Sequence, residues 1–255
     1  MAKERIDVIL ARRGLAPSKE KAGVLVMAGE IYVGKERITK PDKKIADDAH
    51  IEIRKNPIPY VSFGGVKLEE AIRAFGIDIR HKKVLDIGSS TGGFVDCLLK
   101  YGASIVYAID VGTHQLHERL RKDGRIIIKE NINARYLTFE DIGVKVDVIT
   151  IDVSFISLKK ILPAMIPLMN AGGFIISLLK PQFEVGRFEV GKGGIVKDDD
   201  KIKKVIEDIK MYGKALGIIP VSVVESPREK EKKNREYFIL WEPQKPQNQS
   251  NSSQA

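Results

Sequence analysis

Glycines and carboxylic acids gather in one short stretch of the chain, Val84–Leu99, which reads VLDIGSSTGGFVDCLL. This order of residue types predicts a buried strand, a glycine-rich turn and a helix with an apolar face. In open α/β sheets such a turn lies beyond the carboxyl end of a strand, where the N–H groups of a helix N-terminus face a ligand. The stretch therefore predicts a ligand site. Simple turn formation is the alternative, because Gly and Asp are common in such loops.

The spacing of the glycines and the acid before them indicate the kind of ligand. A nicotinamide-binding turn has the spacing G-x-G-x-x-G, whereas this turn reads G-x-x-x-G-G and follows Asp86. An acid here would repel a pyrophosphate, and it suits a ligand that carries an ammonium and a sulfonium. S-adenosylmethionine is such a ligand, so we expect it as the cofactor and disfavour a nicotinamide enzyme.

The ends of the next predicted strands supply the other expected contacts of this cofactor. Asp110 ends the strand that follows the turn, where an acid can accept hydrogen bonds from two ribose hydroxyls. The stretch Glu130–Asn133 follows a third strand, where such folds cradle an adenine. The residues expected at the cofactor are Asp86, Gly88, Ser89, Ser90, Thr91, Gly92, Gly93, Phe94, Asp110, Asn131, Ile132 and Asp152.

Four charged residues, far apart in the chain, stand near predicted ends of strands or helices. Two apolar strands end at Asp152 and Lys180. Lys67 stands at the very start of a predicted helix, and Glu236 begins the last strand. Because the carboxyl ends of parallel strands meet at one edge of a sheet, the four side chains can converge beside a bound cofactor.

Length and composition limit the class of protein. A chain of 255 residues corresponds to one or two domains with a sizeable core. No apolar run approaches the ~20 residues of a membrane span, and the first residues lack a signal peptide, so we expect a cytoplasmic protein without a membrane partner. The single Cys97 lies in an apolar helix and is expected in the core, and the histidines show no metal-ligand spacing. The net charge of +9 is compatible with a nucleic-acid partner but does not decide it.

The chain divides into four predicted parts. Residues 1–56 form a small α+β unit, residues 57–60 a proline-containing linker, and residues 61–242 an α/β unit. In the small unit the sequence predicts two short helices followed by strands at residues 31–33 and 51–53. Strands alternate with helices in the α/β unit, which predicts a doubly wound, Rossmann-like sheet of about seven strands. Residues 243–255 are too polar to pack and are expected to be a disordered tail.

The small unit resembles a known RNA-binding fold. Its sequence RIDVILARRGLAPSKEKAGVLVMAGEIYVGKERITKP is similar to the alpha-L fold named after a small-subunit ribosomal protein. In that family the second helix and the basic residues around it grip RNA phosphates, whereas the alternative is a plain solvated surface. The resemblance implies RNA contacts at Arg5, Ser18, Lys19, Lys21 and Lys43.

The loop of residues 181–196 is rich in glycine and cations. It could act as a mobile flap over the RNA, and a plain surface loop is the alternative. The flap would add Arg187 and Lys192 to the RNA-binding residues.

The order of motifs in the larger unit resembles the FtsJ-type RNA 2'-O-methyltransferases. With the alpha-L unit in front, and with VSFGGVKL, DIGSSTGGF, DVSFISL, KPQFEVGR and GKGGIV present, the resemblance extends to the TlyA or hemolysin A-like family over about residues 3–242. It implies S-adenosylmethionine-dependent 2'-O-methylation of ribosomal RNA, with cytidine as the family's target. The family's Lys-Asp-Lys-Glu tetrad maps onto Lys67, Asp152, Lys180 and Glu236.

Chemistry suggests a role for each member of this tetrad. A ribose 2'-hydroxyl is a very weak acid, so methyl transfer to it needs a base or a stabiliser of the developing oxyanion, and in-line placement of the reacting atoms. Lys180 is the candidate base, which must be neutral to act, and Asp152 would orient it. Lys67 would stabilise the oxyanion, and Glu236 would hold Lys67 or the ribose.

Other functions remain open at this point. A non-catalytic RNA-binding protein would need a decayed site, yet both cofactor acids and the whole tetrad are present. A pore-forming haemolysin fits poorly with the absence of an export signal or an amphipathic spanning segment. The sequence does not distinguish a monomer from a homodimer.

Overall fold

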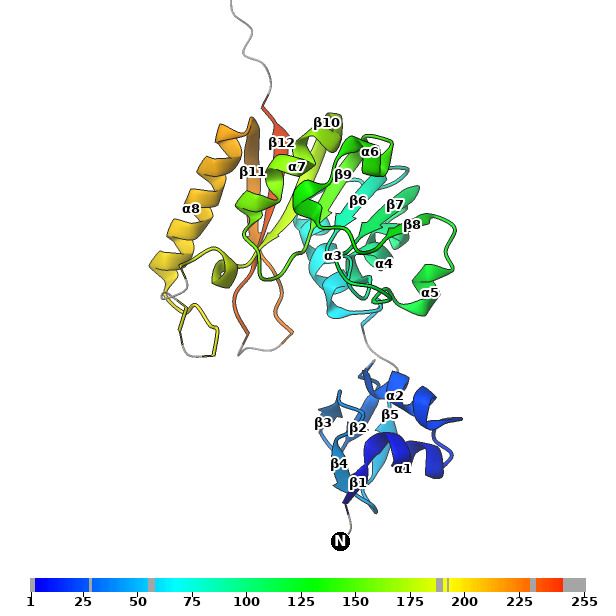
Figure 1. Cartoon of the computed structure of the whole chain (residues 1–255). Helices are drawn as coiled ribbons and strands as arrows, with labels where there is room; N and C mark the ends of the chain where they lie inside the picture. The colour runs from blue at the N-terminus through cyan, green and yellow to red at the C-terminus, as the bar shows by residue number, and fades with distance from the viewer. Residues whose placement is uncertain are drawn as a thin grey trace, which may run out of the picture. The chain divides into compact units, whose positions relative to one another are not determined.

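The computed structural model describes residues 3–27, 29–54, 58–186, 190–191, 193–229 and 233–244. The chain falls into two compact units, Met1–Ser62 and Phe63–Ala255 (Figure 1). Within the described part of the chain, no helix has the length and apolar content needed to cross a membrane.

The N-terminal unit packs two helices against short strands. Apolar residues at helical spacing, among them Ile6, Leu10 and Val26, are fully buried in one cluster, which holds this unit together. The two helices and the strands at residues 31–33 and 51–53 lie where the sequence predicts them. The elements are β1 (Lys3–Arg5), α1 (Ile6–Arg12), α2 (Lys19–Met27), β2 (Ile31–Val33), β3 (Glu36–Ile38), β4 (Lys44–Ala46) and β5 (Ile51–Ile53). β1 pairs with β4, and the other three strands form a sheet in the order β3-β2-β5.

The larger unit is built on one sheet of seven strands in the order β11-β12-β10-β9-β6-β7-β8. The five strands from β10 to β8 in this order are parallel, and β12 runs antiparallel between β10 and β11. The prediction of a doubly wound seven-stranded sheet is confirmed. The strands are β6 (Lys83–Ile87), β7 (Ile105–Ile109), β8 (Ile126–Lys129), β9 (Val146–Ile151), β10 (Met169–Leu179), β11 (Ile218–Glu225) and β12 (Tyr237–Pro243).

Helices cover both faces of this sheet (Figure 1). On one face, strand residues such as Leu85 and Ile149 pack in one buried cluster with Leu162 and Ile209 from two helices. On the other face, Phe94 lies against Phe238 with their ring centroids 6.0 Å apart. The helices are α3 (Phe63–Phe75), α4 (Gly93–Lys100), α5 (Glu118–Arg121), α6 (Phe139–Ile142), α7 (Leu162–Met165) and α8 (Asp199–Ala215). Short 3-10 turns are η1 (Ala134–Tyr136), η2 (Leu158–Lys160), η3 (Ile166–Leu168) and η4 (Pro181–Phe183).

Some boundaries differ from the sequence-based expectations. The prediction that Lys67 stands at the very start of its helix is wrong, because α3 begins at Phe63 and includes two glycines before the lysine. Packing of the buried side of α3 outweighs the helix penalty of about 1 kcal/mol for each glycine. Glu236 directly precedes β12. Pro243, which the sequence assigned to the tail, ends β12, while residues 245–255 lie outside the described residues.

Candidate active site

The ends of three neighbouring strands bring charged residues to one edge of the sheet. Asp152 follows β9 and Lys180 follows its parallel neighbour β10, so both lie at the carboxyl edge. β12 runs antiparallel to β10 with Leu179 opposite Tyr237. Glu236, one residue before Tyr237, therefore reaches the same edge as Lys180. Strand direction alone thus gathers three predicted members of the tetrad.

The tetrad forms two ion pairs. Lys180 Nζ lies 2.5 Å from Asp152 Oδ1, and Lys67 Nζ lies 2.5 Å from Glu236 Oε2. The four side chains are 10 to 22 % exposed, so water screens their charges only in part. Lys67 reaches this edge from the second turn of α3. The structure therefore brings the four residues together in pairs of opposite charge.

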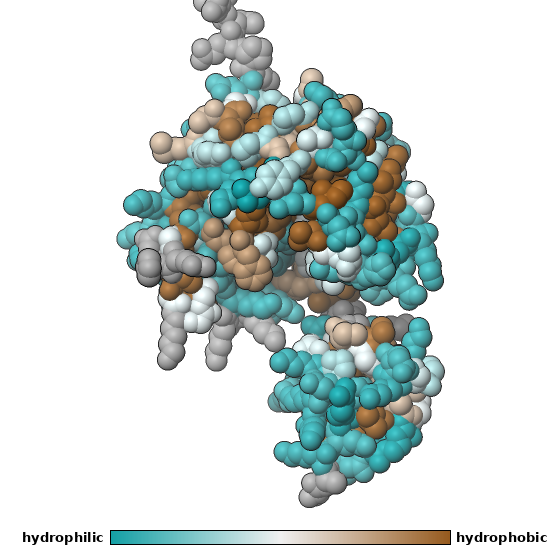
Figure 2. All heavy atoms as spheres, viewed as in Figure 1, coloured by the Kyte–Doolittle hydropathy of each residue, from teal (hydrophilic) through white to brown (hydrophobic). Residues whose placement is uncertain are grey.

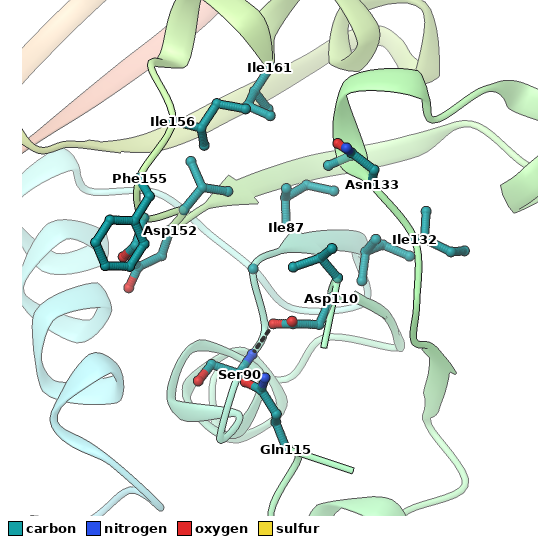
Figure 3. Close-up of a pocket in the computed structure, with 16 residues that line it drawn as sticks. Ile87, Ser90, Asp110, Gln115, Ile132, Asn133, Asp152, Phe155, Ile156 and Ile161 are labelled. Atoms are coloured by element: carbon teal, nitrogen blue, oxygen red, sulfur yellow. Dashed lines mark hydrogen bonds between the residues drawn. The ribbon is translucent and has the colours of Figure 1, made fainter. Parts of the chain in front are cut away.

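A cavity of about 440 Å³ is lined in part by Asp152, the partner of Lys180 (Figure 3). Its size suits a small-molecule ligand. Five residues expected at a cofactor line it, namely Gly88, Ser90, Asp110, Ile132 and Asp152. The other lining residues are Ile87, Ile109, Val111, Gln115, Asn133, Ala134, Val153, Ser154, Phe155, Ile156 and Ile161.

The glycine-rich turn lies directly against the neighbouring strand end. Gly88 has a φ of +83°, and a Cβ placed on it would collide with the carbonyl oxygen of Asp152. Gly92, at the N-cap of α4, has a φ of +92°. Only glycine adopts these angles without strain, and its small size leaves the backbone open to a ligand. The turn predicted from the sequence therefore has a steric reason for its glycines.

Asp110 is fixed by the backbone of two loops. Its Oδ2 accepts a hydrogen bond of 2.7 Å from the Ser90 backbone N–H, which Figure 3 marks with a dashed line. Its Oδ1 accepts another of 2.7 Å from the Gly112 N–H. A carboxylate oxygen can accept a second hydrogen bond, so Asp110 keeps acceptor capacity toward the cavity that it lines.

Asp86 differs from the charged acid that the sequence suggested. Its carboxyl group is 1 % exposed, and burial raises its pKa to about 7, although hydroxyls of Thr150 and Ser89 favour the ionised form. Thr150 Oγ1 donates a 2.5 Å hydrogen bond to Asp86 Oδ1. Asp86 Oδ2 is buried, and no partner for it lies among the described residues. The nearby carboxylates of Asp110 and Asp152 also raise this pKa.

The remaining residues expected at the cofactor do not line the cavity. Ser89 is buried and donates to the backbone oxygen of Asp86, and Phe94 is buried in the packing of α4. Asn131 has a φ of +60° and donates its backbone N–H to Gly112 O. The residues outside the lining are Asp86, Ser89, Thr91, Gly92, Gly93, Phe94 and Asn131.

Sequence reasoning missed a polar and an aromatic residue of the cavity. Gln115 lies in the loop that follows β7, whereas Asn133 belongs to the stretch after β8 where the sequence predicted an adenine. Phe155 is 91 % exposed at a φ of +64°, and its ring centroid lies 5.1 Å from that of Phe183. One signal in the sequence could have identified Phe155 as a site residue. It is an aromatic residue in the loop directly after a strand that ends in an acid.

The predicted RNA-binding residues of the N-terminal unit have different partners. Arg5 donates two hydrogen bonds to Asp7, and Lys43 pairs with Glu36. Ser18 Oγ accepts the N–H of Lys21 at 3.2 Å at the start of α2. Lys19 and Lys21 are exposed, on a unit whose visible face in Figure 2 is mostly hydrophilic. Two further predicted residues, Arg187 and Lys192, lie outside the described residues.

Comparisons with known proteins match both units of the chain. The FtsJ-like methyltransferase family matches residues 60–242, and the S4 domain matches residues 4–51. The chain therefore belongs to the FtsJ-like methyltransferase family, and it carries an S4 domain in front of the enzyme domain. The resemblance described from the sequence motifs is confirmed.

Individual relatives are similar over most of the chain. It is 42% identical to Hemolysin A of Brachyspira hyodysenteriae over 92% of this chain and 98% of that protein. It is 40% identical to the 16S/23S rRNA (cytidine-2'-O)-methyltransferase TlyA of Mycobacterium tuberculosis, over 93% of this chain and 88% of that protein. A solved structure from Streptococcus thermophilus that carries the name hemolysin superimposes with a TM-score of 0.75 at 39% identity, covering 96% of this chain and 90% of the other.

Proposed function

We propose that this protein uses S-adenosylmethionine to methylate the 2'-hydroxyl of a cytidine in ribosomal RNA. The observation that carries this proposal is the Asp152–Lys180 ion pair, which borders the cavity in a chain of the FtsJ-like family. A lysine paired with a carboxylate can hold or accept a proton where a weakly acidic hydroxyl must react. The relatives named as rRNA (cytidine-2'-O)-methyltransferases support the choice of substrate.

The residues around the cavity fit this cofactor. Because Gly88 has no side chain where it passes close to Asp152, a ligand can lie against the bare backbone there. Asp110 offers hydrogen-bond acceptors for ribose hydroxyls. The second oxygen of Asp86, for which no partner lies among the described residues, would accept a hydrogen bond from an ammonium. S-adenosylmethionine, when bound, supplies a methyl group activated by a sulfonium.

The tetrad would act on the substrate hydroxyl. Lys180 would take the 2'-hydroxyl proton at Nζ, and Asp152 would hold the amine in place. Lys67 would stabilise negative charge on the ribose oxygen, while its pairing with Glu236 fixes its position.

The substrate would be gripped by two features outside the tetrad. We infer that the S4 domain binds RNA, and that the exposed Lys19 and Lys21 meet phosphates there. The ring of Phe155, 91 % exposed beside the cavity, offers a flat surface on which an unstacked base can lie. Since ribosomal subunits are the proposed substrate, we infer that the protein works in the cytoplasm, as a monomer or a homodimer.

The direct test uses ribosomal subunits from a strain that lacks this gene. Incubation with the protein and S-adenosylmethionine carrying a labelled methyl group, followed by digestion to nucleosides and mass spectrometry, should yield 2'-O-methylcytidine. Lys180→Ala should abolish this product and keep the affinity for S-adenosylmethionine, measured by isothermal titration. Methylation of a base instead of a ribose, or full turnover by Lys180→Ala, would contradict the proposal.

A further inference from the structure

Ser154 touches the candidate base without belonging to the tetrad. It lies in the loop after β9, two residues beyond Asp152, where its side chain is exposed and lines the cavity. Its Oγ accepts a hydrogen bond of 3.1 Å from Lys180 Nζ. The same Nζ lies 2.5 Å from Asp152 Oδ1. The candidate base therefore has two oxygen partners that come from one short loop.

A hydrogen bond restricts the direction of an amine more than an ion pair does. The nitrogen of a lysine has four tetrahedral positions, and Cε takes one of them. Ser154 Oγ accepts the N–H at a second position, whereas Asp152 Oδ1 contacts Nζ as an ion pair and has no hydrogen-bond partner among the described residues. When the amine is neutral, the remaining positions hold one N–H and the lone pair. With the ion pair alone, the amine could turn about its Cε–Nζ bond and present the lone pair in more than one direction.

We propose that Ser154 is a positioning residue, which aims the lone pair of Lys180 at the ribose hydroxyl. This inference rests on the proposed function, because it needs Lys180 to act as the base. A base aimed in one direction reaches the reactive geometry more often than one that rotates. Ser154 itself forms no bond in the reaction and takes no proton.

The loop that carries Ser154 is anchored at two points to the segment after β10. Glu184, which follows η4, accepts a 2.5 Å hydrogen bond from Ser157 Oγ and a 2.7 Å hydrogen bond from the Leu158 backbone N–H. Phe155, the next residue after Ser154, has the left-handed φ of +64° and packs on Phe183. The surrounding structure must support so uncommon a conformation. The loop therefore presents the Ser154 hydroxyl from a fixed backbone, although the side chain is exposed.

Two substitutions separate the hydroxyl from the loop. Ser154→Ala removes the hydroxyl and adds no bulk, whereas Ser154→Thr keeps a hydroxyl and adds a methyl group. If the hydroxyl aims Lys180, kcat of Ser154→Ala should fall roughly 10- to 100-fold. The KM values for ribosomal subunits and for S-adenosylmethionine should stay within about threefold of wild type, and Ser154→Thr should recover most of kcat.

The outcomes of this experiment are distinct. A Ser154→Ala variant with wild-type kcat overturns the inference, and so does one that raises KM for the subunits with kcat unchanged, because Ser154 would then contact substrate. A Ser154→Thr variant as slow as Ser154→Ala also overturns it, since the shape of the loop would be the cause. Lys180→Ala is measured alongside. If it is fully active, or if wild type yields no 2'-O-methylcytidine, the proposed function fails and this inference fails with it.

Discussion

Gly88 and Asp152 are so close that no side chain can stand between them. The turn after β6 passes the end of β9 at this point, and Asp152 N donates a 2.9 Å hydrogen bond to Ile87 O. A Cβ on Gly88 would meet the carbonyl oxygen of Asp152. The residue that orients the candidate base is therefore placed by the same contact that shapes the proposed cofactor turn.

Gly88→Ala should consequently impair both binding and catalysis. The new methyl group must push back the backbone of Asp152, and alanine is strained at a φ of +83°. We expect a loss of about 1–3 kcal/mol in unfolding free energy and no measurable binding of S-adenosylmethionine by isothermal titration. Gly172→Ala is the matched control, because Gly172 has a φ of +79° with open space around its Cβ position. Equal effects of the two variants on binding would argue against the contact.

Asp86→Asn should change how stability depends on pH. Burial raises the pKa of this carboxyl group to about 7 in the folded protein, against an ordinary value of 3.8. A raised pKa in the folded state means that its stabilising contribution is complete below about pH 4 and is lost as the pH rises through about 7. Asparagine does not ionise, so at pH 8 the variant should be more stable than wild type by up to about 4 kcal/mol.

Urea unfolding at pH 5 and pH 8 measures this difference. The advantage of Asp86→Asn should grow between the two pH values, because wild type must bury a charge at the higher one. Parallel pH dependence in both proteins would show that Asp86 ionises in the folded state as easily as in the unfolded chain.

The Lys67–Glu236 pair should show coupling in a double-mutant cycle. Its side chains are 19 % and 17 % exposed, so Lys67→Ala leaves a largely buried carboxylate without its cation. We expect a loss on the order of 3 kcal/mol in unfolding free energy for Lys67→Ala. Adding Glu236→Gln should restore part of that stability and none of the methylation.

A second ion pair, whose carboxylate is exposed, provides the control for this cycle. Lys210 pairs with Glu207 on α8, and their side chains are 27 % and 62 % exposed. Lys210→Ala should cost less than about 1 kcal/mol and leave methylation unchanged. A Lys67→Ala variant that is as stable and as active as Lys210→Ala would remove Lys67 from the proposed site.

Phe155→Ala should weaken RNA binding and leave the fold intact. The ring is 91 % exposed, so its removal gives up little packing, and we expect unfolding free energy to change by less than about 0.5 kcal/mol. Loss of base stacking should raise the KM for ribosomal subunits by roughly 5- to 150-fold, which corresponds to about 1–3 kcal/mol. Met211→Ala, at a 69 % exposed site on α8, is the control that should change neither quantity. An unchanged KM for ribosomal subunits in Phe155→Ala would show that this ring does not bind the substrate.

Lys19→Ala combined with Lys21→Ala should reduce the salt dependence of RNA binding. Both lysines are exposed in the first turn of α2, and no ion pair of either is found in the described part of the chain. If each meets a phosphate, the slope of log affinity against log salt should become shallower by about 0.7 to 0.9 per lysine. Filter binding to ribosomal RNA at several salt concentrations measures the slope, and S-adenosylmethionine affinity should not change. A slope identical to that of wild type would show that Lys19 and Lys21 do not contact RNA phosphates.

The sequence predicted correctly those features of the site that depend on the residues of a single strand. Asp152 and Lys180 each close an apolar run, and parallel strands with apolar interiors must end at the same edge, so their convergence could be foreseen. Lys67 was misplaced along its helix because the packing of α3 overrides the intrinsic preference of its glycines. The strands β1 (KER), β3 (ERI) and β4 (KIA) were missed because each has a charged residue at its start and none has the continuous or alternating β-branched pattern of the equally short β2 (IYV) and β5 (IEI).

Other features of the site depend on tertiary contacts that no local pattern contains. The proton affinity of Asp86 follows from its complete burial beside Thr150, which lies on a different strand. Ser154 meets Lys180 only because Glu184 closes the loop after β9 against the loop after β10. Such contacts require the assembled fold, so the sequence identified Asp86 and Lys180 but not the residues that contact their side chains.

The antiparallel course of β12 has a consequence for newly made protein. Lys67 and its partner Glu236 are separated by 169 positions in the chain, and β12, which directly follows Glu236, is the last strand of the sheet in chain order. A nascent polypeptide thus emerges from the ribosome with its proposed cofactor turn already synthesised and its fourth charged group still missing. Methylating activity would arise only after β12 has been synthesised and has inserted beside β10.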